Sequence, residues 1–250
     1  MIITSFNILA DVFIDFKNPE IYYPTIKKEM LKMKHRFNTL IKYIHGDIIM
    51  LQEVTPYIRN KIISIFGDKY IVLPLSVHIS TTETTGNLTL LKRNKFGAIQ
   101  YDTLYINNTA VSVTSVKSDK SDKSIKSDKS VTYNDDIAIY NIHLNDVSHD
   151  IRMKELKHII STFDKTKKII IGGDFNSDNK KLHHLLKDFK IGIQSKSTYL
   201  CEDPMIDCIY VYGFKKAIGY VDNKINSKNC FQATIEKYGS DHYPVYTTLI

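Results

Sequence analysis

The 250-residue sequence has no tryptophan and contains only 10 glycines, 6 prolines and three cysteines. So little glycine and proline excludes a collagen-like chain. The odd number of cysteines, with no Cys-x-x-Cys pair, argues against both a disulfide framework and a zinc ribbon. No run of eighteen apolar residues is present to form a transmembrane helix, and the N-terminus lacks the features of a secretory signal. These absences predict an intracellular protein, cytoplasmic or nuclear, with no membrane span.

The overall composition is that of an ordinary globular protein. Hydrophobic residues make up 43% of the chain and charged residues 24%, and a chain of this length can bury a sizeable core. Lysine and arginine number 34 against 27 acidic residues, a net charge of +7. Such a charge favours an anionic partner such as nucleic acid, although a solvated lysine-rich surface produces the same sum.

One segment, residues 115–132, is a near-repeat of Lys, Ser and Asp. Its composition cannot enter a core, so we expect a flexible loop. Because strand patterns flank it, it is interpreted as a long hairpin connection, whose extra length costs little closure entropy. A basic arm for a polyanion is an alternative, but the Asp residues offset much of the Lys charge. No linker divides the chain, so residues 1–250 are predicted to form a single domain.

The rest of the sequence alternates strand and helix patterns, which predicts an α/β layered fold. The helices are expected at residues 24–44, 56–65, 151–163 and 181–189. Gly46 is the expected stop of the first helix. The principal strands are expected at residues 2–8, 47–54, 70–75, 89–92, 97–104, 110–116, 136–144, 169–176, 206–213 and 242–250.

Polar side chains follow or precede several of these apolar strands. They are Asn7, Gln52, Glu53, Asn141, His143, Asp174, Asn176, Asp207, Ser240, Asp241 and His242. Because strand ends in a layered α/β protein converge on one edge, these side chains can share a cleft. Carboxylates gathered there would repel each other and lose hydration, and a divalent cation relieves both costs. Oxygen ligands without thiolates suit Mg²⁺ or Mn²⁺ better than Zn²⁺.

Each of these residues also has a structural interpretation when taken alone. Asn7 could cap a turn, Glu53 could lie on the surface, and His143 could be a core histidine. Asp174 could serve turn chemistry, since Gly, Asp and Asn favour turns. The ordered set on successive strand ends favours the functional interpretation. The other histidines are interpreted as structural: His35, His78, His149, His183 and His184.

Six blocks carry a resemblance to a known superfamily: SFNILAD, DIIMLQEV, NIHL, IIIGGDFNS, IDCIYV and GSDHYPV. In this order they resemble the endonuclease/exonuclease/phosphatase superfamily, the DNase-I-like phosphoesterases. The match runs from Asn7 to the last strand and leaves out the Lys-Ser-Asp segment. The resemblance implies a four-layered α/β sandwich, with two facing mixed sheets flanked by helices. It also implies Mg²⁺-dependent hydrolysis of a phosphate ester.

The resemblance also assigns roles at the metal. Glu53 matches the metal-binding glutamate of the superfamily, and Asp241 matches a second acidic residue near the metal. Asn7 matches the asparagine that supports both the metal and the phosphate.

The remaining matches concern the reacting phosphate. His143 and Asn176 match residues that contact the phosphate, and Asp174 matches the aspartate that orients or deprotonates the attacking water. His242 matches a second phosphate-binding histidine, and Asp207 matches the aspartate that supports it.

The N-terminal half is similar to one branch, that of the carbon-catabolite-repression deadenylases, nocturnin, the angel proteins and the 2′-phosphodiesterase. The similarity rests on SFNILAD, Tyr22-Tyr23-Pro24, Arg36 and LQEV. This favours RNA or an oligonucleotide over DNA as substrate and partner. The stretch before Asp207 lacks the aromatic residue typical of the deadenylases, so poly(A) specificity stays open.

Four alternatives remain open. LQEVTPYIRNKI resembles the tyrosyl-DNA phosphodiesterase branch, which keeps DNA-end processing possible. Abasic-site cleavage is a related alternative. A phosphoinositide phosphatase or a sphingomyelinase-like hydrolase is another. The last is a catalytically inactive nucleic-acid-binding module. A monomer is compatible with all of these.

Overall fold

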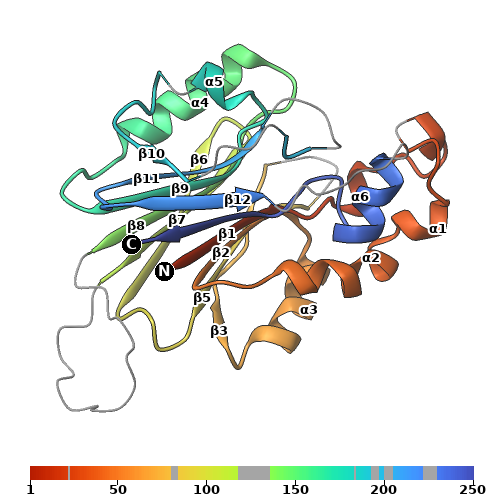
Figure 1. The fold of residues 1–250 in the computed structure, drawn as a ribbon, viewed down its shortest axis with the longest axis horizontal. Helices are drawn as coiled ribbons and strands as arrows, with labels where there is room; N and C mark the ends of the chain where they lie inside the picture. Colours follow the sequence, from red (N-terminus) through yellow and green to blue (C-terminus); the bar gives the residue numbers. More distant parts are fainter. Residues whose placement is uncertain are drawn as a thin grey trace.

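The computed structural model of the protein describes residues 1–21, 23–79, 84–117, 136–182, 184–192, 197–199, 205–221 and 230–250. Two β-sheets face each other and helices cover their outer surfaces, which makes a four-layered α/β arrangement (Figure 1). None of the helices among the described residues combines the length and apolarity needed to span a membrane. The expected α/β sandwich is confirmed.

The first sheet has the order β12-β13-β1-β2-β5-β3, with β4 also paired to β5. Its strands are β12 (Ala217–Val221), β13 (Val245–Leu249), β1 (Ile2–Asn7), β2 (Ile48–Val54), β5 (Gly86–Lys92), β3 (Tyr70–Val72) and β4 (Ser76–Val77). Among the strand pairs that the structure describes in this sheet, β1 and β2 are parallel and the others are antiparallel, so the sheet is mixed.

The second sheet has the order β10-β11-β9-β8-β7-β6. Its strands are β10 (Lys190–Ile191), β11 (Asp207–Tyr212), β9 (Lys168–Asp174), β8 (Ile137–His143), β7 (Thr109–Val116) and β6 (Ile99–Ile106). Again one central pair, β8 and β9, is parallel. The two parallel pairs therefore each present two carboxyl ends, and these ends carry the polar residues described below.

The helices form the outer layers and one end of the molecule (Figure 1). Over the second sheet lie α4 (His149–Ser161) and α5 (Asn179–Leu182). Beside the first sheet lie α1 (Lys28–Leu31), α2 (Met33–Leu40), α3 (Pro56–Phe66) and α6 (Cys230–Tyr238). Short 3-10 helices occupy Asp11–Phe13, Pro19–Ile21 and Ile41–Tyr43.

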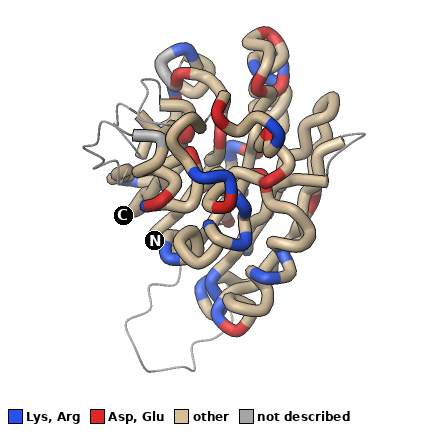
Figure 2. Tube along the Cα trace, turned by 90° about the vertical axis from the view of Figure 1, so that its right-hand side faces the viewer, with Lys and Arg blue, Asp and Glu red and all other residues tan. Residues whose placement is uncertain are grey.

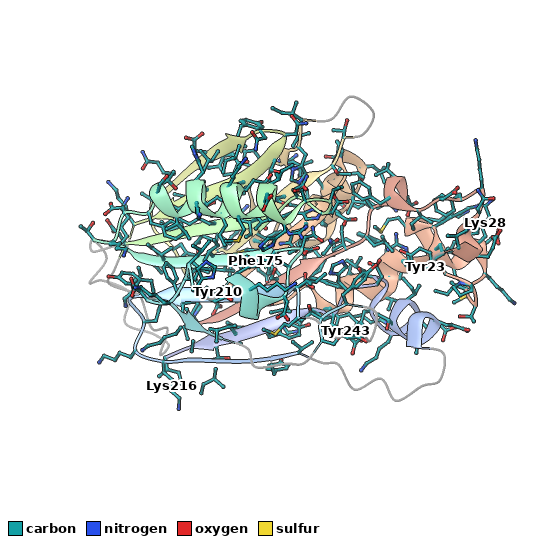
Figure 3. All side chains as sticks on the ribbon, turned by 90° about the horizontal axis from the view of Figure 1, so that it is seen from above. Tyr23, Lys28, Phe175, Tyr210, Lys216 and Tyr243 are labelled. Carbon is teal, nitrogen blue, oxygen red and sulfur yellow. The ribbon has the colours of Figure 1, made fainter. Side chains whose placement is uncertain are left out.

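Strand β2 shows how the apolar runs build two core layers. Ile48 and Met50 pack into the cluster between the sheets, whereas Ile49 and Leu51 pack into the cluster beneath the helices. Because successive side chains of a strand point to opposite faces, a strand covered on both sides reads as a continuous apolar run. Between the layers lie Phe175 and Tyr210, whose ring centroids are 5.5 Å apart, while Lys28 and Lys216 lie at the periphery (Figure 3).

Charges of both signs are interspersed along the trace (Figure 2). The view faces the end of the molecule that carries α1 and α6. The net charge of +7 is therefore not concentrated in one block of this end.

The predicted helix at residues 24–44 is wrong as a single helix. Lys32 is extended, with φ −64° and ψ 133°, and separates α1 from α2. The side chain of Asp11 explains the break, because its two carboxylate oxygens accept from Met33 N at 2.7 and 3.0 Å. This acidic cap comes from a residue 22 positions earlier in the sequence. It starts a new helix at a point where the spacing of the apolar residues alone predicts one continuous helix.

Other boundaries also differ from the predictions. The helix expected at 181–189 is the single turn of α5, and both α6 and β12 were not predicted. Of the segment 115–132, Ser115 and Val116 belong to β7, and residues 118–132 lie outside the described residues.

Candidate active site

The residues predicted from the strand ends lie at one end of the two sheets. Asn7 ends β1, His143 ends β8 and Asp174 ends β9. Asp207 begins β11 and lies opposite Asp174 in the antiparallel register. Glu53 lies near the end of β2, which is parallel to β1. These side chains therefore lie together in one site, because each sheet contains a parallel strand pair and the two sheets are stacked.

Glu53 is directed into the site by an irregularity in its strand. The register of β2 against β5 shifts between Leu51 and Val54, and Glu53 has a φ of +60°. A bulge with a left-handed residue redirects a side chain that regular alternation would point elsewhere. Asn7 Nδ2 donates to Glu53 Oε1 at 2.7 Å, and Ala10 N donates to Oε2 at 2.8 Å. Burial raises the pKa of the Glu53 carboxyl; the nearby imidazole of His143 opposes this shift, and the negative charge of Asp241 adds to it.

Asp174 is the point at which the polar groups meet. Its Oδ2 accepts from Asn7 Nδ2 at 3.1 Å and lies 3.8 Å from His143 Nε2 and 3.7 Å from His242 Nε2. Its Oδ1 accepts from Asn176 N at 2.8 Å. Asp174 is almost fully buried, with 1% of its surface exposed. One carboxylate oxygen is therefore oriented by an amide and faces two imidazoles.

The two glycines before Asp174 allow this close approach. A Cβ on Gly172 would lie 2.4 Å from Met50 Cε of the facing sheet. A Cβ on Gly173, whose φ is +147°, would lie 1.8 Å from the carbonyl oxygen of Ile142. The Gly-Gly-Asp sequence is thus required by packing between the sheets and by the conformation just before the site.

His242 and Asp207 form a buried pair. His242 Nδ1 lies 2.9 Å from Asp207 Oδ2, and both residues are at most 5% exposed. Burial alone lowers the pKa of the imidazole, but Asp207 and Asp174 together raise it well above its ordinary value. Thr198 Oγ1 accepts from the Asp207 backbone N–H at 2.9 Å, which holds the start of β11. His242 therefore carries a proton and directs Nε2 toward Asp174.

Asp241 has a partner that was not predicted as a site residue. Tyr23 donates its hydroxyl to Asp241 Oδ2 at 3.0 Å, and Ser240 Oγ contacts Oδ1 at 3.4 Å. Burial raises the pKa of Tyr23, and the charge of Asp241 raises it further, so the phenol stays protonated. The Tyr22-Tyr23-Pro24 stretch was the available signal, but it did not indicate which side chain Tyr23 contacts.

Arg36 holds together the loops that bear these residues. It is 2% exposed, and its guanidinium donates to the carbonyl oxygens of Ile8, Leu9, Leu31 and Gly239 and to Asp11. The segment after Asn7 and the segment before Ser240 are therefore joined through one side chain. Arginine suits this task because its fork presents several fixed donors.

Gln52 and Asn141 were found at strand ends but lie between the sheets. Gln52 Nε2 donates to Asn141 Oδ1 at 2.7 Å, and Asn141 Nδ2 donates to the carbonyl oxygens of Leu51 and Leu88. Both side chains are fully buried. They hold one sheet to the other beneath the site.

The site contains groups able to hold a metal ion. Asp174, Asp207 and His242 have ligand atoms within 4.8 Å of one another and are all buried. The hydrogen bond of His242 Nδ1 to Asp207 Oδ2 already occupies two of these atoms. Glu53 and Asp241 are a second pair of carboxylates at the site, and the negative charge of Asp241 helps to raise the pKa of Glu53. Their donors are oxygens, the ligand type preferred by Mg²⁺.

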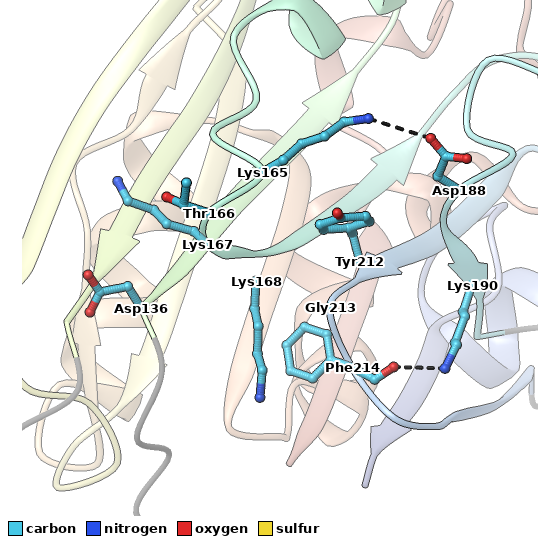
Figure 4. Close-up of a pocket in the computed structure, with 10 residues that line it drawn as sticks. All are labelled: Asp136, Lys165, Thr166, Lys167, Lys168, Asp188, Lys190, Tyr212, Gly213 and Phe214. Carbon is cyan, nitrogen blue, oxygen red and sulfur yellow. Dashed lines mark hydrogen bonds and ion pairs between the residues drawn. The ribbon is translucent and has the colours of Figure 1, made fainter.

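A separate cavity of about 760 Å³ lies at the other end of the second sheet (Figure 4). Its lining includes Lys165, Lys168 and Lys190. Lys168 begins β9 and Asp174 ends it, so the two positions are about 20 Å apart at the rise of a strand. Lys165 pairs with Asp188 at 3.5 Å, and Lys190 donates to the Phe214 carbonyl oxygen at 2.8 Å. This cavity is distinct from the candidate active site.

Comparison with known proteins shows similarity in structure. A scan against protein-family models finds no match, and a search of curated proteins finds none either. ANGEL2, described as a 2′,3′-cyclic phosphatase, aligns with a TM-score of 0.73 and 13% identity over 99% of this chain and 94% of its own. An endonuclease/exonuclease/phosphatase protein from Bacteroides vulgatus aligns with a TM-score of 0.66 and 16% identity, over 100% of this chain and 98% of its own.

A third similar structure is truncated TDP2 from Caenorhabditis elegans. It aligns with a TM-score of 0.58 and 15% identity over 100% of this chain and 96% of its own. These identities establish similarity of fold. The chain therefore has the fold of the endonuclease/exonuclease/phosphatase proteins, which ANGEL2 shares. This is the fold that the sequence resemblance implied.

Proposed function

We propose that the protein is a Mg²⁺-dependent phosphodiesterase that hydrolyses RNA or oligonucleotides. The observation that carries the proposal is the convergence on Asp174 Oδ2 of Asn7 Nδ2, His143 Nε2 and His242 Nε2, at 3.1 to 3.8 Å. A carboxylate oriented by an amide and flanked by two imidazoles suits water attack on a phosphate whose oxygens need hydrogen-bond donors.

Glu53 and Asp241 are the residues we assign to the metal, with Asn7 supporting them. Asn7 holds the Glu53 carboxylate through Nδ2, and Tyr23 holds Asp241. When bound there, Mg²⁺ or Mn²⁺ would neutralise phosphate charge and stabilise the leaving oxygen. The oxygen-only donor set fits such an ion, because it contains no thiolate and no imidazole.

Asp174 is assigned to the attacking water. Asn7 and Asn176 fix both of its oxygens, so the carboxylate can orient a water molecule and accept its proton. The water oxygen then bonds to phosphorus as the bond from phosphorus to the leaving oxygen breaks, and the leaving oxygen takes a proton from solvent. A positioned base of this kind contributes about 10²–10⁴-fold to the rate.

His143, Asn176 and His242 are assigned to the phosphate. The protonated His242, held by Asp207, and His143 can donate to oxygens that gain negative charge in the transition state. Removing one such donor typically costs about 3–4 kcal/mol of transition-state stabilisation. The His143 side chain is 15% exposed, more than that of Asp174 or His242, so it lies nearer the entrance for substrate.

The reaction class is tested with labelled RNA and DNA oligonucleotides in Mg²⁺ and in EDTA. We expect cleavage that requires the metal and falls at least about 10²-fold in Glu53→Gln and Asp174→Asn. Asp68→Asn, an exposed aspartate in the turn before β3, is the matched control and should be fully active. Metal-independent cleavage, or cleavage unaffected by both active-site variants, would contradict the proposal.

The substrate class is tested with a panel of compounds, one for each function that the sequence analysis left open. The compounds are RNA, RNA ending in a 2′,3′-cyclic phosphate, a DNA end with a tyrosyl adduct, abasic-site DNA, phosphoinositide and sphingomyelin. The cyclic phosphate is included because ANGEL2, which is similar in structure, is described as a 2′,3′-cyclic phosphatase. The tyrosyl adduct is included because LQEVTPYIRNKI resembles the tyrosyl-DNA phosphodiesterase branch. We expect the highest kcat/KM with RNA.

A further inference from the structure

His78 packs against the candidate phosphate-binding residue His143. The two imidazole rings are nearly perpendicular, at 85°, with centroids 5.6 Å apart. The backbone around His78 is held on both sides, because His78 N donates to Thr85 O at 2.9 Å and Ile79 N donates to Asn108 O at 3.0 Å. The ring of His78 therefore projects from a fixed backbone immediately after β4.

The protonation state of His78 follows from its contacts. Ala110 N donates to His78 Nδ1 at 3.1 Å, so Nδ1 is an acceptor and the neutral ring carries its hydrogen on Nε2. Burial lowers the pKa of His78 to about 3, and the neighbouring imidazole of His143 contributes to the shift. At neutral pH the ring is therefore an uncharged group with a defined tautomer.

His78 Nε2 is buried without a hydrogen-bond acceptor among the described residues. Leaving a buried donor unpaired costs about 1–3 kcal/mol, so its retention calls for an explanation. Its aromatic neighbour is the ring of His143, and perpendicular packing of two aromatic rings is an attractive geometry.

The two candidate phosphate-binding histidines are held in different ways. His242 is oriented by a 2.9 Å hydrogen bond from Nδ1 to Asp207. His143 has, within the described part of the chain, a contact of 3.8 Å to Asp174, which is too long for a hydrogen bond. A histidine that acts on substrate needs its ring orientation fixed by a neighbour.

We propose that His78 is the positioning residue of His143, holding its ring by edge-to-face packing so that Nε2 stays directed at Asp174 and the phosphate. What His143 does in catalysis rests on the proposed function, whereas the restraint is a property of the folded protein. His78 therefore serves the site without contacting the substrate.

Two substitutions separate the contacts of His78. His78→Asn places an amide oxygen near the position of Nδ1, so it can keep the bond from Ala110 but loses the ring against His143. His78→Phe keeps an aromatic ring against His143 but loses the acceptor for Ala110 N. The exposed His158→Asn, on α4, is the matched control. The ring resonances of His143 are recorded by NMR for each variant without substrate, and kcat and KM are measured separately.

We expect His78→Asn to shift and broaden the His143 resonances and to lower kcat about tenfold, with KM changed less than about twofold. His78→Phe should keep most of kcat, because it keeps the ring that packs against His143, and His158→Asn should change neither measurement. In a background of His143→Asn, the substitution of His78 should have no further effect on kcat.

The outcomes distinguish this inference from the proposed function. Unchanged His143 resonances in His78→Asn would overturn the positioning role, even if activity falls. Full activity in His143→Asn would instead contradict the catalytic role of His143. The NMR comparison would then still decide whether His78 orients its neighbour.

Discussion

Tyr23 and Asp241, 218 positions apart in the sequence, are joined by a hydrogen bond of 3.0 Å within the buried site. The phenol is contributed by the segment between β1 and α1, whereas the carboxylate precedes β13. This bond holds one of the two carboxylates that we assign to Mg²⁺, so it links the N-terminal segment to metal binding.

Tyr23→Phe should weaken Mg²⁺ binding while leaving the fold intact. Removing the hydroxyl deletes one hydrogen bond to a charged group, for which we expect a loss of about 1.5–3 kcal/mol of stability at most. The concentration of Mg²⁺ that gives half-maximal activity should rise several-fold. Tyr105→Phe, on the exposed part of β6, is the control. An unchanged Mg²⁺ titration would show that Tyr23 does not position Asp241.

Glu53→Gln should separate metal binding from folding stability. Burial raises the pKa of Glu53, so its ionised form is unfavourable in the absence of a cation. In EDTA the variant should therefore be within about 1 kcal/mol of wild type, since relief of the buried charge offsets a lost hydrogen bond.

Adding Mg²⁺ should stabilise wild type but not Glu53→Gln. A ligand at 100 times its Kd stabilises the folded state by about 2.7 kcal/mol, which thermal denaturation resolves readily. Asp68→Asn should respond to Mg²⁺ as wild type does. Equal stabilisation of Glu53→Gln would place the ion elsewhere, for instance at the Asp174, Asp207 and His242 group.

The Asp207–His242 pair predicts a pH-dependent stability. Because the folded-state pKa of His242 is raised, the folded protein keeps a proton that the unfolded chain releases near pH 6.5. The stabilisation is complete below that pH and is lost as the pH rises through the folded-state pKa. In Asp207→Asn the pKa of His242 falls, so the stability advantage of wild type over the variant should shrink with rising pH.

Urea denaturation in EDTA across pH 6 to 9 measures this difference. A gap between wild type and Asp207→Asn that is constant over this range would contradict a raised pKa of His242. The same variant should lower kcat by about 10² or more, since His242 loses the group that fixes its orientation.

Arg36→Met should be strongly destabilising. It leaves the carbonyl oxygens of Ile8, Leu9 and Gly239 without their buried donor and breaks the contact with Asp11. Breaking such a network costs about 3–5 kcal/mol. Arg36→Lys keeps the positive charge but not the forked guanidinium, so it should recover only part of the lost stability. Lys28→Met, at an exposed position on the short helix α1, is the control. Equal denaturation midpoints for both methionine variants would contradict the joining role of Arg36.

The sequence alone determined the layered α/β class and predicted most of the polar residues that the structure brings together at one end of the sheets. Buried strands such as β2 read as apolar runs because both faces are covered, and their polar ends stand out against them. Local chemistry also indicated a turn near Asp174, and the structure has it just after β9, where Asp174 Oδ1 accepts from Asn176 N.

The tertiary structure decided which of these polar ends meet and what each one touches. The break at Lys32 depends on Asp11 reaching Met33, and the role of Tyr23 depends on Asp241 in a distant segment. Gln52 and Asn141 share the strand-end pattern of the site residues, yet they join the two sheets instead. Long-range contacts such as these follow from how the sheets stack, and periodicity along a single strand carries no information about the layer that faces it.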